Sequence, residues 1–242
     1  MLKLHYNLEK FSLGLVAAII LAASVGGFVE IAPLFKIHET VDLPDDLRPN
    51  TPLELAGRRI YMREGCYACH SQMVRSLADE IDRYGPYSLA SESAYDHPML
   101  WGSKRTGPDL ARLGNKYSDV WHVRHLIDPR SVVPASIMPS YPWLTQSLDT
   151  SMLRDSLATL AKLNVPYNAA MISAAEPDAL AQSRPDSDGA EKLSERYGES
   201  VAVRDFDGDP SRLTELDALV AYLQSLGRLT TASFEVMSED GQ

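Results

Sequence analysis

The first strong pattern in the chain is an uninterrupted run of uncharged residues, from Phe11 to Val29. At about 1.5 Å per residue, a helix of these 19 positions approaches the roughly 30 Å hydrocarbon core of a membrane. A cleaved signal peptide is the alternative, but its apolar stretch is usually shorter, about 7–15 residues, and ends at a small-residue cleavage site. Here apolar residues continue past Glu30 as far as Phe35. The pattern therefore predicts a retained transmembrane anchor, residues 1–38.

The charges on the two sides of this run differ in sign. Two lysines precede it, and the acidic residues that follow it are Glu39, Asp42, Asp45 and Asp46. Because basic residues stay on the cytoplasmic side of a membrane, the N-terminus is predicted to be cytoplasmic. The chain would then cross a bacterial inner membrane once, with most of its length in the periplasm.

Helical patterns return after residue 50. Thr51 can cap a helix that begins at Pro52 and carries Glu54 at its third position, which is a capping-box arrangement. Ser118 can cap a second helix that runs to Ile127. Near the C-terminus, apolar residues recur at helical spacing before Gly227, at Leu213, Leu216, Leu219, Val220, Leu223 and Leu226. These patterns predict a mainly α fold.

Prolines and charges divide the rest of the chain. Pro44 and Pro49 among acidic residues, with Pro52 directly after the segment, predict a linker at 39–51, because such prolines forbid a continuous helix. A domain at 52–229 and a tail at 230–242 follow. Between Glu176 and Asp217 there are twelve acidic and five basic residues, which supply most of the formal net charge of -10. We expect a solvated acidic insertion at about 166–212; a docking face for a basic cytochrome is the alternative.

The sequence also argues against a nucleic-acid partner and against an EF-hand calcium loop. No basic face is available for phosphate neutralisation, so we expect no nucleic-acid partner. Asp205, Asp207 and Asp209 suggest a calcium loop, but the EF-hand pattern needs glycine and glutamate where this chain has Pro210 and Leu216.

The run Cys66-Tyr67-Ala68-Cys69-His70 is the strongest chemical motif. A Cys-x-x-Cys-His run is typical of covalent c-type haem attachment, in which both thiols bond the haem and the histidine binds its iron. A zinc site would need two more ligands at finger spacing, and a thioredoxin-like pair would follow a strand, whereas helical spacing precedes Cys66. These cysteines are the chain's only two, so a simple disulfide between them is the third alternative. We predict one covalently bound haem c.

A haem of this kind needs a sixth ligand, for which methionine or histidine is usual. Met138 is best placed, because prolines on both sides of its loop can hold the thioether rigidly over the haem. His122 and His125 are the alternative, a bis-histidine site, although histidines in a helix are more often packed or surface residues. The other methionines lie beside the attachment turn or in a helical pattern, where core packing is the default.

Several motifs around these residues resemble one protein family. The chain is similar to the mono-haem subunit II of cbb3-type cytochrome c oxidases in the anchor and in the motifs Cys66-Tyr67-Ala68-Cys69-His70-Ser71-Gln72-Met73-Val74-Arg75, Arg83-Tyr84-Gly85, Tyr95-Asp96-His97-Pro98, Trp101-Gly102-Ser103-Lys104-Arg105-Thr106-Gly107-Pro108-Asp109-Leu110 and Asp128-Pro129-Arg130. The match ends near Leu144; beyond it only the closing helix is similar, and the acidic insertion is a departure.

The resemblance implies one N-terminal transmembrane helix and a class I cytochrome c-like helical domain with insertions. Pro108 would pack against His70, and its loop would orient the histidine ring. The chain would relay electrons from a di-haem cytochrome c subunit toward the haem b and haem-copper centre of the large catalytic subunit of a proton-pumping oxidase. It would not bind oxygen itself, because His70 and Met138 fill both axial positions.

The resemblance also implies contacts with the large subunit. Residues Ser71 to Arg105 would dock on that subunit, and Ser103 would lie near a calcium ion at the interface. Two other functions stay open, the cytochrome c subunit of a nitric oxide reductase and a free-standing membrane-anchored electron shuttle. The segment from Tyr84 to Leu110 argues against both, because a shuttle needs no such insertion.

Overall fold

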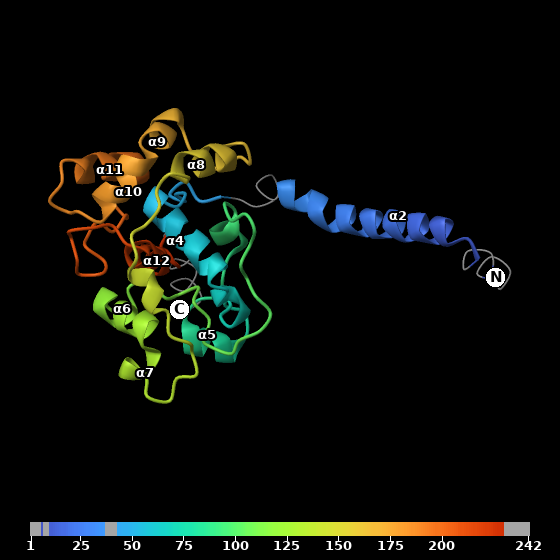
Figure 1. The fold of residues 1–242 in the computed structure, drawn as a ribbon, viewed down its shortest axis with the longest axis horizontal. Helices are drawn as coiled ribbons and strands as arrows, with labels where there is room; N and C mark the ends of the chain where they lie inside the picture. The colour runs from blue at the N-terminus through green and yellow to red at the C-terminus, as the bar shows by residue number, and fades with distance from the viewer. Residues whose placement is uncertain (1–5, 7–9, 37–42, 230–242) are drawn as a thin grey trace, which may run out of the picture. The chain divides into compact units, whose positions relative to one another are not determined.

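The computed structural model describes residues 6, 10–36 and 43–229, and they form two units, Met1–Leu43 and Pro44–Gln242. Their regular elements are helices, and the described residues contain no strand beyond an isolated bridge between Ser147 and Thr214. In chain order the helices are α2 (Ser12–Ile31), η1 (Ala32–Lys36), α4 (Pro52–Arg63), η2 (Cys66–Ala68), α5 (Ala78–Tyr84), η3 (Ala90–Ser93), α6 (Asp119–Ile127), α7 (Pro129–Val132), η4 (Pro142–Thr145), α8 (Leu153–Ala161), α9 (Ala169–Ser173), α10 (Ala175–Gln182), α11 (Gly189–Tyr197) and α12 (Glu215–Ser225). The predicted mainly α fold is confirmed (Figure 1).

The first unit consists of α2 and η1. Helix α2 has 20 residues, is long and apolar enough to cross a membrane, and buries no side chain within the protein. Its side chains are apolar on every face, so the helix offers no polar stripe to water. A helix that could span a membrane is therefore present where the sequence predicts one. Residues 1–5, 7–9, 37 and 38 of the predicted anchor and the tail 230–242 lie outside the described residues.

The second unit begins earlier than the sequence predicts. Leu47, Arg48, Asn50 and Thr51 are all buried, and the backbone N–H of Arg48 donates to the carbonyl of Leu229 at 3.1 Å. The part of the predicted linker nearest the domain is therefore packed into it. The physical reason is charge pairing, because the Arg48 guanidinium forms two hydrogen bonds, of 2.7 and 2.9 Å, to a carboxylate on the first helix, that of Glu54.

Helix α4 starts with the capping box that the sequence predicts. The Thr51 hydroxyl accepts from the Glu54 N–H at 3.2 Å, and the Glu54 carboxylate accepts from the Thr51 N–H at 2.9 Å. Pro52 occupies the first helical position, where its missing N–H costs nothing. Glu54 thus satisfies both the helix end and the buried Arg48.

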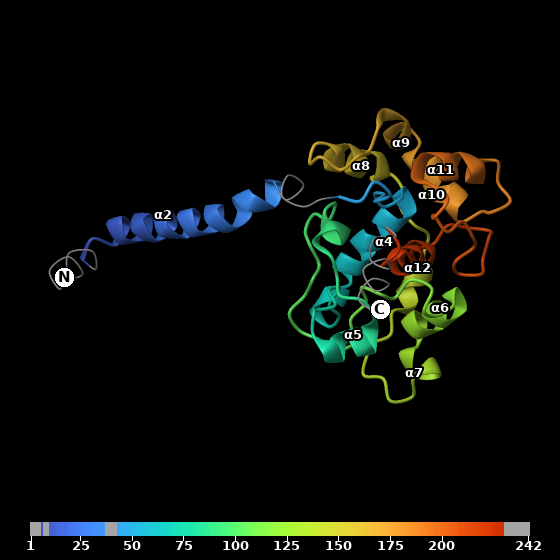
Figure 2. The same ribbon diagram turned by 180° about the vertical axis from the view of Figure 1, so that it is seen from behind.

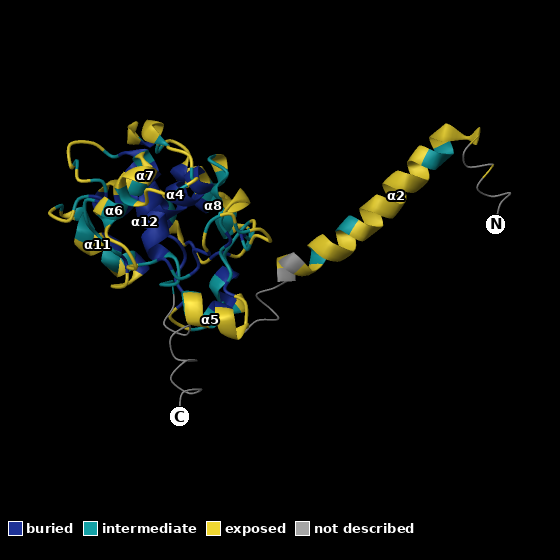
Figure 3. Cartoon of the chain, turned by 90° about the horizontal axis from the view of Figure 1, so that it is seen from below, coloured by how far each residue is buried: buried dark blue, intermediate teal, exposed yellow. Residues whose placement is uncertain are grey.

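Helices α4 and α12 pack together at the centre of the second unit (Figures 1 and 2). Their backbones approach so closely at Gly57 that an added Cβ would lie 1.9 Å from the Ala218 carbonyl oxygen. Tyr61 and Tyr222 meet edge to face beside this crossing, with ring centroids 5.6 Å apart. Every residue of α12 is buried (Figure 3), so the predicted closing helix is confirmed.

The acidic segment is not the solvated insertion that its charge suggests. Helix α10 packs against α4 and α8, and the segment adds several residues to the core, Ala175, Ala179, Leu193, Tyr197 and Phe206. At 2.5 Å, the Thr51 hydroxyl donates to Gln182, which is fully buried. The prediction is wrong because a count of acids ignores their spacing. The acids of α11 lie on its exposed face while Leu193 and Tyr197 are buried, and many of the other acids lie in the loops between the helices.

Candidate functional site

The two cysteines lie in a tight turn directly after α4. Gly65 has φ of +72°, a left-handed conformation that ends the helix and starts the short helix η2. Within the turn, the His70 N–H donates to the Cys66 carbonyl at 2.9 Å. Both cysteines are free thiols, so the disulfide alternative is not adopted, and burial raises the pKa of Cys66 to about 12. A redox-active Cys-x-x-Cys pair needs a lowered thiol pKa, so this site does not resemble one.

A second loop, residues 106–110, lies against the turn on both sides of His70. The Gly107 N–H donates to the Cys69 carbonyl at 2.9 Å, and the Leu110 N–H donates to the Ser71 carbonyl at 2.8 Å. Between these two bonds, Nδ1 of His70 lies 2.8 Å from the carbonyl oxygen of Pro108. A carbonyl only accepts, so Nδ1 carries the proton and Nε2 keeps its lone pair for a metal.

Gly107 leaves the space that the His70 ring occupies. A Cβ at this position would lie 2.2 Å from Cε1 and 2.8 Å from Nε2 of the imidazole. These distances are far below van der Waals contact, so the loop can lie over the ring only because residue 107 lacks a side chain. The Gly-Pro pair in the sequence therefore has a specific steric role here.

A buried carboxylate joins the two loops. Asp109 accepts from the Ser71 hydroxyl at 2.6 Å, from the Met73 N–H at 2.9 Å and from the Ala111 N–H at 2.8 Å. Arg105 donates to the Ser71 hydroxyl at 2.6 Å and to the Met73 carbonyl at 2.9 Å. This network fixes the backbone on both sides of His70. Sequence reasoning did not assign it a role, although the motif that ends in Gly107-Pro108-Asp109-Leu110 was the available signal.

Met138 lies in an irregular loop between α7 and η4. It is half-buried against the hydrophobic core, and its N–H donates to the Ser136 hydroxyl at 3.2 Å. The loop is tied to α6 where the Tyr141 N–H donates to the Leu126 carbonyl at 2.9 Å. A thioether on a loop held at both ends has the fixed position that an axial ligand requires, and Met138 stays a prediction as the sixth ligand.

The two alternative ligands lie on α6, which Ser118 caps as predicted. His122 is 3% exposed, and burial lowers its pKa to about 4, so its ring is neutral at pH 7. It lies edge to face with Trp121, whose ring stacks on that of His125 at 4.5 Å. Both imidazoles are thus packed against an aromatic neighbour, which is the packing role that the sequence predicts for histidines in this helix.

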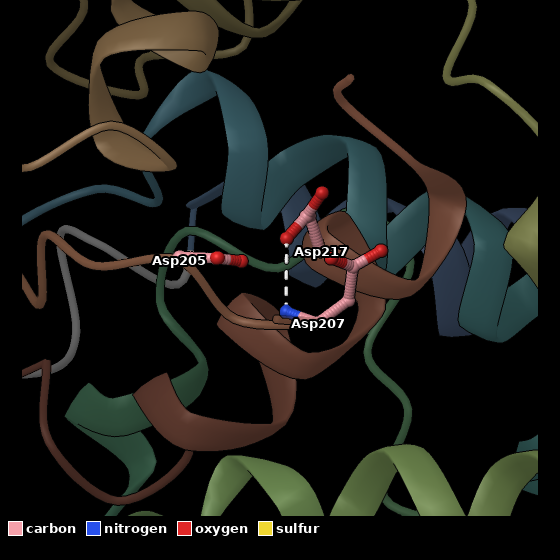
Figure 4. Close-up of side chains that lie close together, drawn as sticks. All are labelled: Asp205, Asp207 and Asp217. Atoms are coloured by element: carbon pink, nitrogen blue, oxygen red, sulfur yellow. Dashed lines mark hydrogen bonds between the residues drawn. The ribbon is translucent and has the colours of Figure 1, made fainter. Parts of the chain in front are cut away.

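Two parts of the chain bear on a cation site, the exposed position of Ser103 and a group of aspartates before α12. Ser103 is exposed and follows Gly102, which has φ of +72°. Among the described residues, the group of three carboxylates that could hold a cation is Asp205, Asp207 and Asp217, whose oxygens lie within 4.8 Å of one another (Figure 4).

These carboxylates have a structural role. Asp217 accepts from the Thr214 N–H at 2.9 Å and from the Asp207 N–H at 3.1 Å, so it caps α12 and holds the preceding loop. Asp209, the third residue of the rejected calcium loop, is not part of the group. The cluster is explained by these caps, and no ion is assigned to it.

The chain is similar to a known protein family along nearly its whole length. A family model described as cytochrome C oxidase, mono-heme subunit/FixO matches residues 5–230, which is nearly the whole chain. No curated protein matches the chain. The match extends through the acidic segment, beyond Leu144, where the motifs of the sequence resemblance end.

Proposed function

Because the chain belongs to the FixO family, the mono-haem subunits of cytochrome c oxidase, we propose that it relays electrons within a cbb3-type oxidase. One covalently bound haem c would take electrons from a di-haem cytochrome c subunit and pass them toward the haem b and oxygen-reducing centre of the large subunit. The hydrogen bond between His70 and Pro108 carries this proposal, because it prepares one imidazole nitrogen for iron.

The residues around His70 fit a haem. Cys66 and Cys69 are free and three positions apart on one turn, as thioether attachment requires. Residue 107 has no side chain, so the ring of His70 stays within the loop and presents Nε2 as the proximal ligand. Met138 would supply the distal ligand. When bound, haem c supplies one-electron redox chemistry.

The loop 106–110 would tune the site through its hydrogen bonds. A carbonyl that accepts from Nδ1 fixes the ring and raises the basicity of Nε2, which favours the oxidised metal. Pro108 is suited to this role because the loop's other contacts, through Asp109 and Arg105, hold its carbonyl in place. These residues therefore position His70 without touching iron.

The chain itself would not catalyse oxygen reduction. His70 and Met138 would fill both axial positions, and oxygen chemistry needs an open one. We propose that catalysis belongs to the large subunit, which pumps protons, and that this chain is its electron-transfer partner. Ser103 stays a candidate calcium ligand at the interface with that subunit, where the partner would have to supply most of the ligands.

Helix α2 would anchor the chain in a bacterial inner membrane. The lysines before it and the acids after it favour a cytoplasmic N-terminus and a periplasmic haem domain. Haem attachment in the periplasm agrees with this orientation.

The decisive experiment is a Cys66→Ala, Cys69→Ala double variant in the intact complex. We expect the variant to lack this haem and to lose electron delivery from a cytochrome donor. Oxygen reduction should persist when a small artificial reductant feeds the large subunit directly. Unchanged turnover with the cytochrome donor would contradict the proposal.

The two other functions are separated by what purifies with the chain from native membranes. A haem-copper oxidase subunit with haem b and a di-haem cytochrome supports the proposal. A nitric oxide reductase subunit, or no partner at all, would favour the corresponding alternative. The family match favours the oxidase.

A further inference from the structure

A cavity of about 350 Å³ lies in the segment that is expected to dock on the large subunit. Its walls come from α5, from Arg75 before that helix and from residues 105–108. Three arginines line it, Arg75, Arg83 and Arg105, together with two carboxylates, Asp79 and Glu80, and the ring of Tyr84. Arg83 and Tyr84, which the haem site does not use, therefore form one wall of a cavity that has one more arginine than carboxylates.

The cavity already holds one carboxylate between arginines. Glu80 is buried, and its oxygens accept from Arg105 at 2.8 Å and from the Arg75 N–H at 2.9 Å, with a further contact to the Arg75 guanidinium. The hydrogen bond from Arg105 is the largest cause that lowers the pKa of Glu80, to about 2, so this carboxylate stays charged. Arginines in the cavity wall therefore already bind one carboxylate, that of Glu80.

Arg83 is different, because it has no carboxylate of its own. In the described part of the chain its guanidinium forms no hydrogen bond and no ion pair, and it is exposed. It lies 5.1 Å from the centroid of the Tyr84 ring, and Arg105 lies 5.3 Å from the same centroid. The aromatic ring holds Arg83 at the cavity while leaving its N–H groups unused.

The cavity shares a wall with the loop that orients His70. Gly107 and Pro108 line it, and Arg105 reaches from it to the Ser71 hydroxyl beside the proximal histidine. A group bound in the cavity would therefore lie next to the haem's proximal side.

We propose that this cavity receives an aspartate or glutamate side chain of the large catalytic subunit, which Arg83 binds as Arg105 binds Glu80. This inference rests on the proposed function and deepens it. The planar guanidinium matches a carboxylate with two parallel hydrogen bonds. A phospholipid headgroup fits less well, because its acyl chains need an apolar path and the lining has no Val, Leu, Ile, Met or Phe side chain.

The test uses zero-length cross-linking in the complex purified from native membranes. An Arg83→Lys variant replaces the guanidinium with an amine, which a carbodiimide joins to a neighbouring carboxylate with loss of water. Arg124→Lys is the matched control, because Arg124 is also exposed and its guanidinium forms no ion pair or hydrogen bond among the described residues.

We expect mass spectrometry to find the introduced amine of Arg83→Lys joined to an acidic residue of the large subunit, and the control to give no such product. A cross-link only within the chain, or equal products from both variants, would overturn the inference.

A charge reversal, Arg83→Glu, gives an independent measurement. We expect the ratio of large subunit to this chain after purification at high salt to fall several-fold, while haem content and the spectrum of the chain stay unchanged. Absence of haem c or of a large haem-copper subunit from the wild-type complex would instead count against the proposed function, so the two failures are distinguishable. If an Arg83→Gln complex stays whole at high salt and loses only bound phosphatidylglycerol, the cavity is a lipid site and the inference is wrong.

Discussion

Nδ1 of His70 lies 2.8 Å from the carbonyl oxygen of Pro108, although 38 positions separate the two residues in the chain. The bond decides which imidazole nitrogen carries the proton, and therefore which one can bind iron. It depends on residue 107, since any side chain there would occupy the space of the ring.

Gly107→Ala should disturb this bond. The added methyl group would lie 2.2 Å from Cε1 of His70, so the ring or the loop must move. We expect less covalently bound haem and a lower free energy of unfolding, by roughly 1–3 kcal/mol as in other overpacked sites. Haem content per chain and denaturant unfolding would measure both. Thr106→Ala, which changes the adjacent exposed residue, should match the wild type; equal losses in both variants would point to general loop damage.

Met138→His should lower the reduction potential by on the order of 0.1 V, within the roughly 0.8 V range that axial ligands span. Imidazole stabilises the oxidised iron better than a thioether does. The weak near-infrared sulfur-to-iron band should disappear, and redox titration with optical detection measures both effects. An unchanged spectrum would make His122 or His125 the ligand.

The isolated reduced chain should bind carbon monoxide negligibly at neutral pH. Two protein ligands leave iron no open position, and carbon monoxide needs one. The optical spectrum before and after addition of the gas is the measurement. Rapid binding would defeat the carrier function, because it requires an open or labile site.

A soluble fragment that starts at Pro44 should keep the haem spectrum, because the second unit contains all the proposed ligands. A fragment that starts at Pro52 should be less stable by about 3–5 kcal/mol, since it leaves the buried Glu54 without Arg48. Denaturant unfolding of the two fragments measures the difference. Equal stability would mean that the Arg48–Glu54 pair adds nothing to the domain.

Asp207→Asn should change how stability depends on pH. Burial, with a contribution from the charge of Asp207, raises the pKa of Asp217 from 3.8 to about 6. The folded chain then holds a proton that the unfolded chain releases, so the free energy of unfolding falls as pH rises from about 4 to 6, by about 3 kcal/mol from this group.

Removal of the neighbouring charge lowers the pKa of Asp217. The variant should therefore gain about 1 kcal/mol over the wild type at pH 7 and lose this advantage below pH 4. Asp186→Asn, at an exposed position outside the cluster, is the control and should show no such difference between the two pH values. A parallel pH dependence in variant and wild type would remove Asp207 as a cause.

Local patterns in the sequence predicted what local chemistry determines. The structure contains the predicted apolar helix α2, the capping box at Thr51 and Glu54, the cap at Ser118 and the closing helix. Each of these features depends on neighbours a few positions apart. The Cys66, Cys69 and His70 run is likewise a local motif, because attachment needs three groups on one turn.

Tertiary structure decided the features that depend on distant residues. The acids between Glu176 and Asp217 suggested a solvated insertion, yet α10 packs against α4 and α11 packs against α10, and apolar residues of both helices join the core. A count of charges cannot detect this packing. The sequence placed Arg48 in a linker, but in the structure Arg48 is buried and pairs with Glu54. The cavity of Arg75, Arg83 and Arg105 exists only because the fold brings together two stretches that are about 20 residues apart in the chain. The spacing of residues within one stretch does not indicate which distant stretch will pack against it.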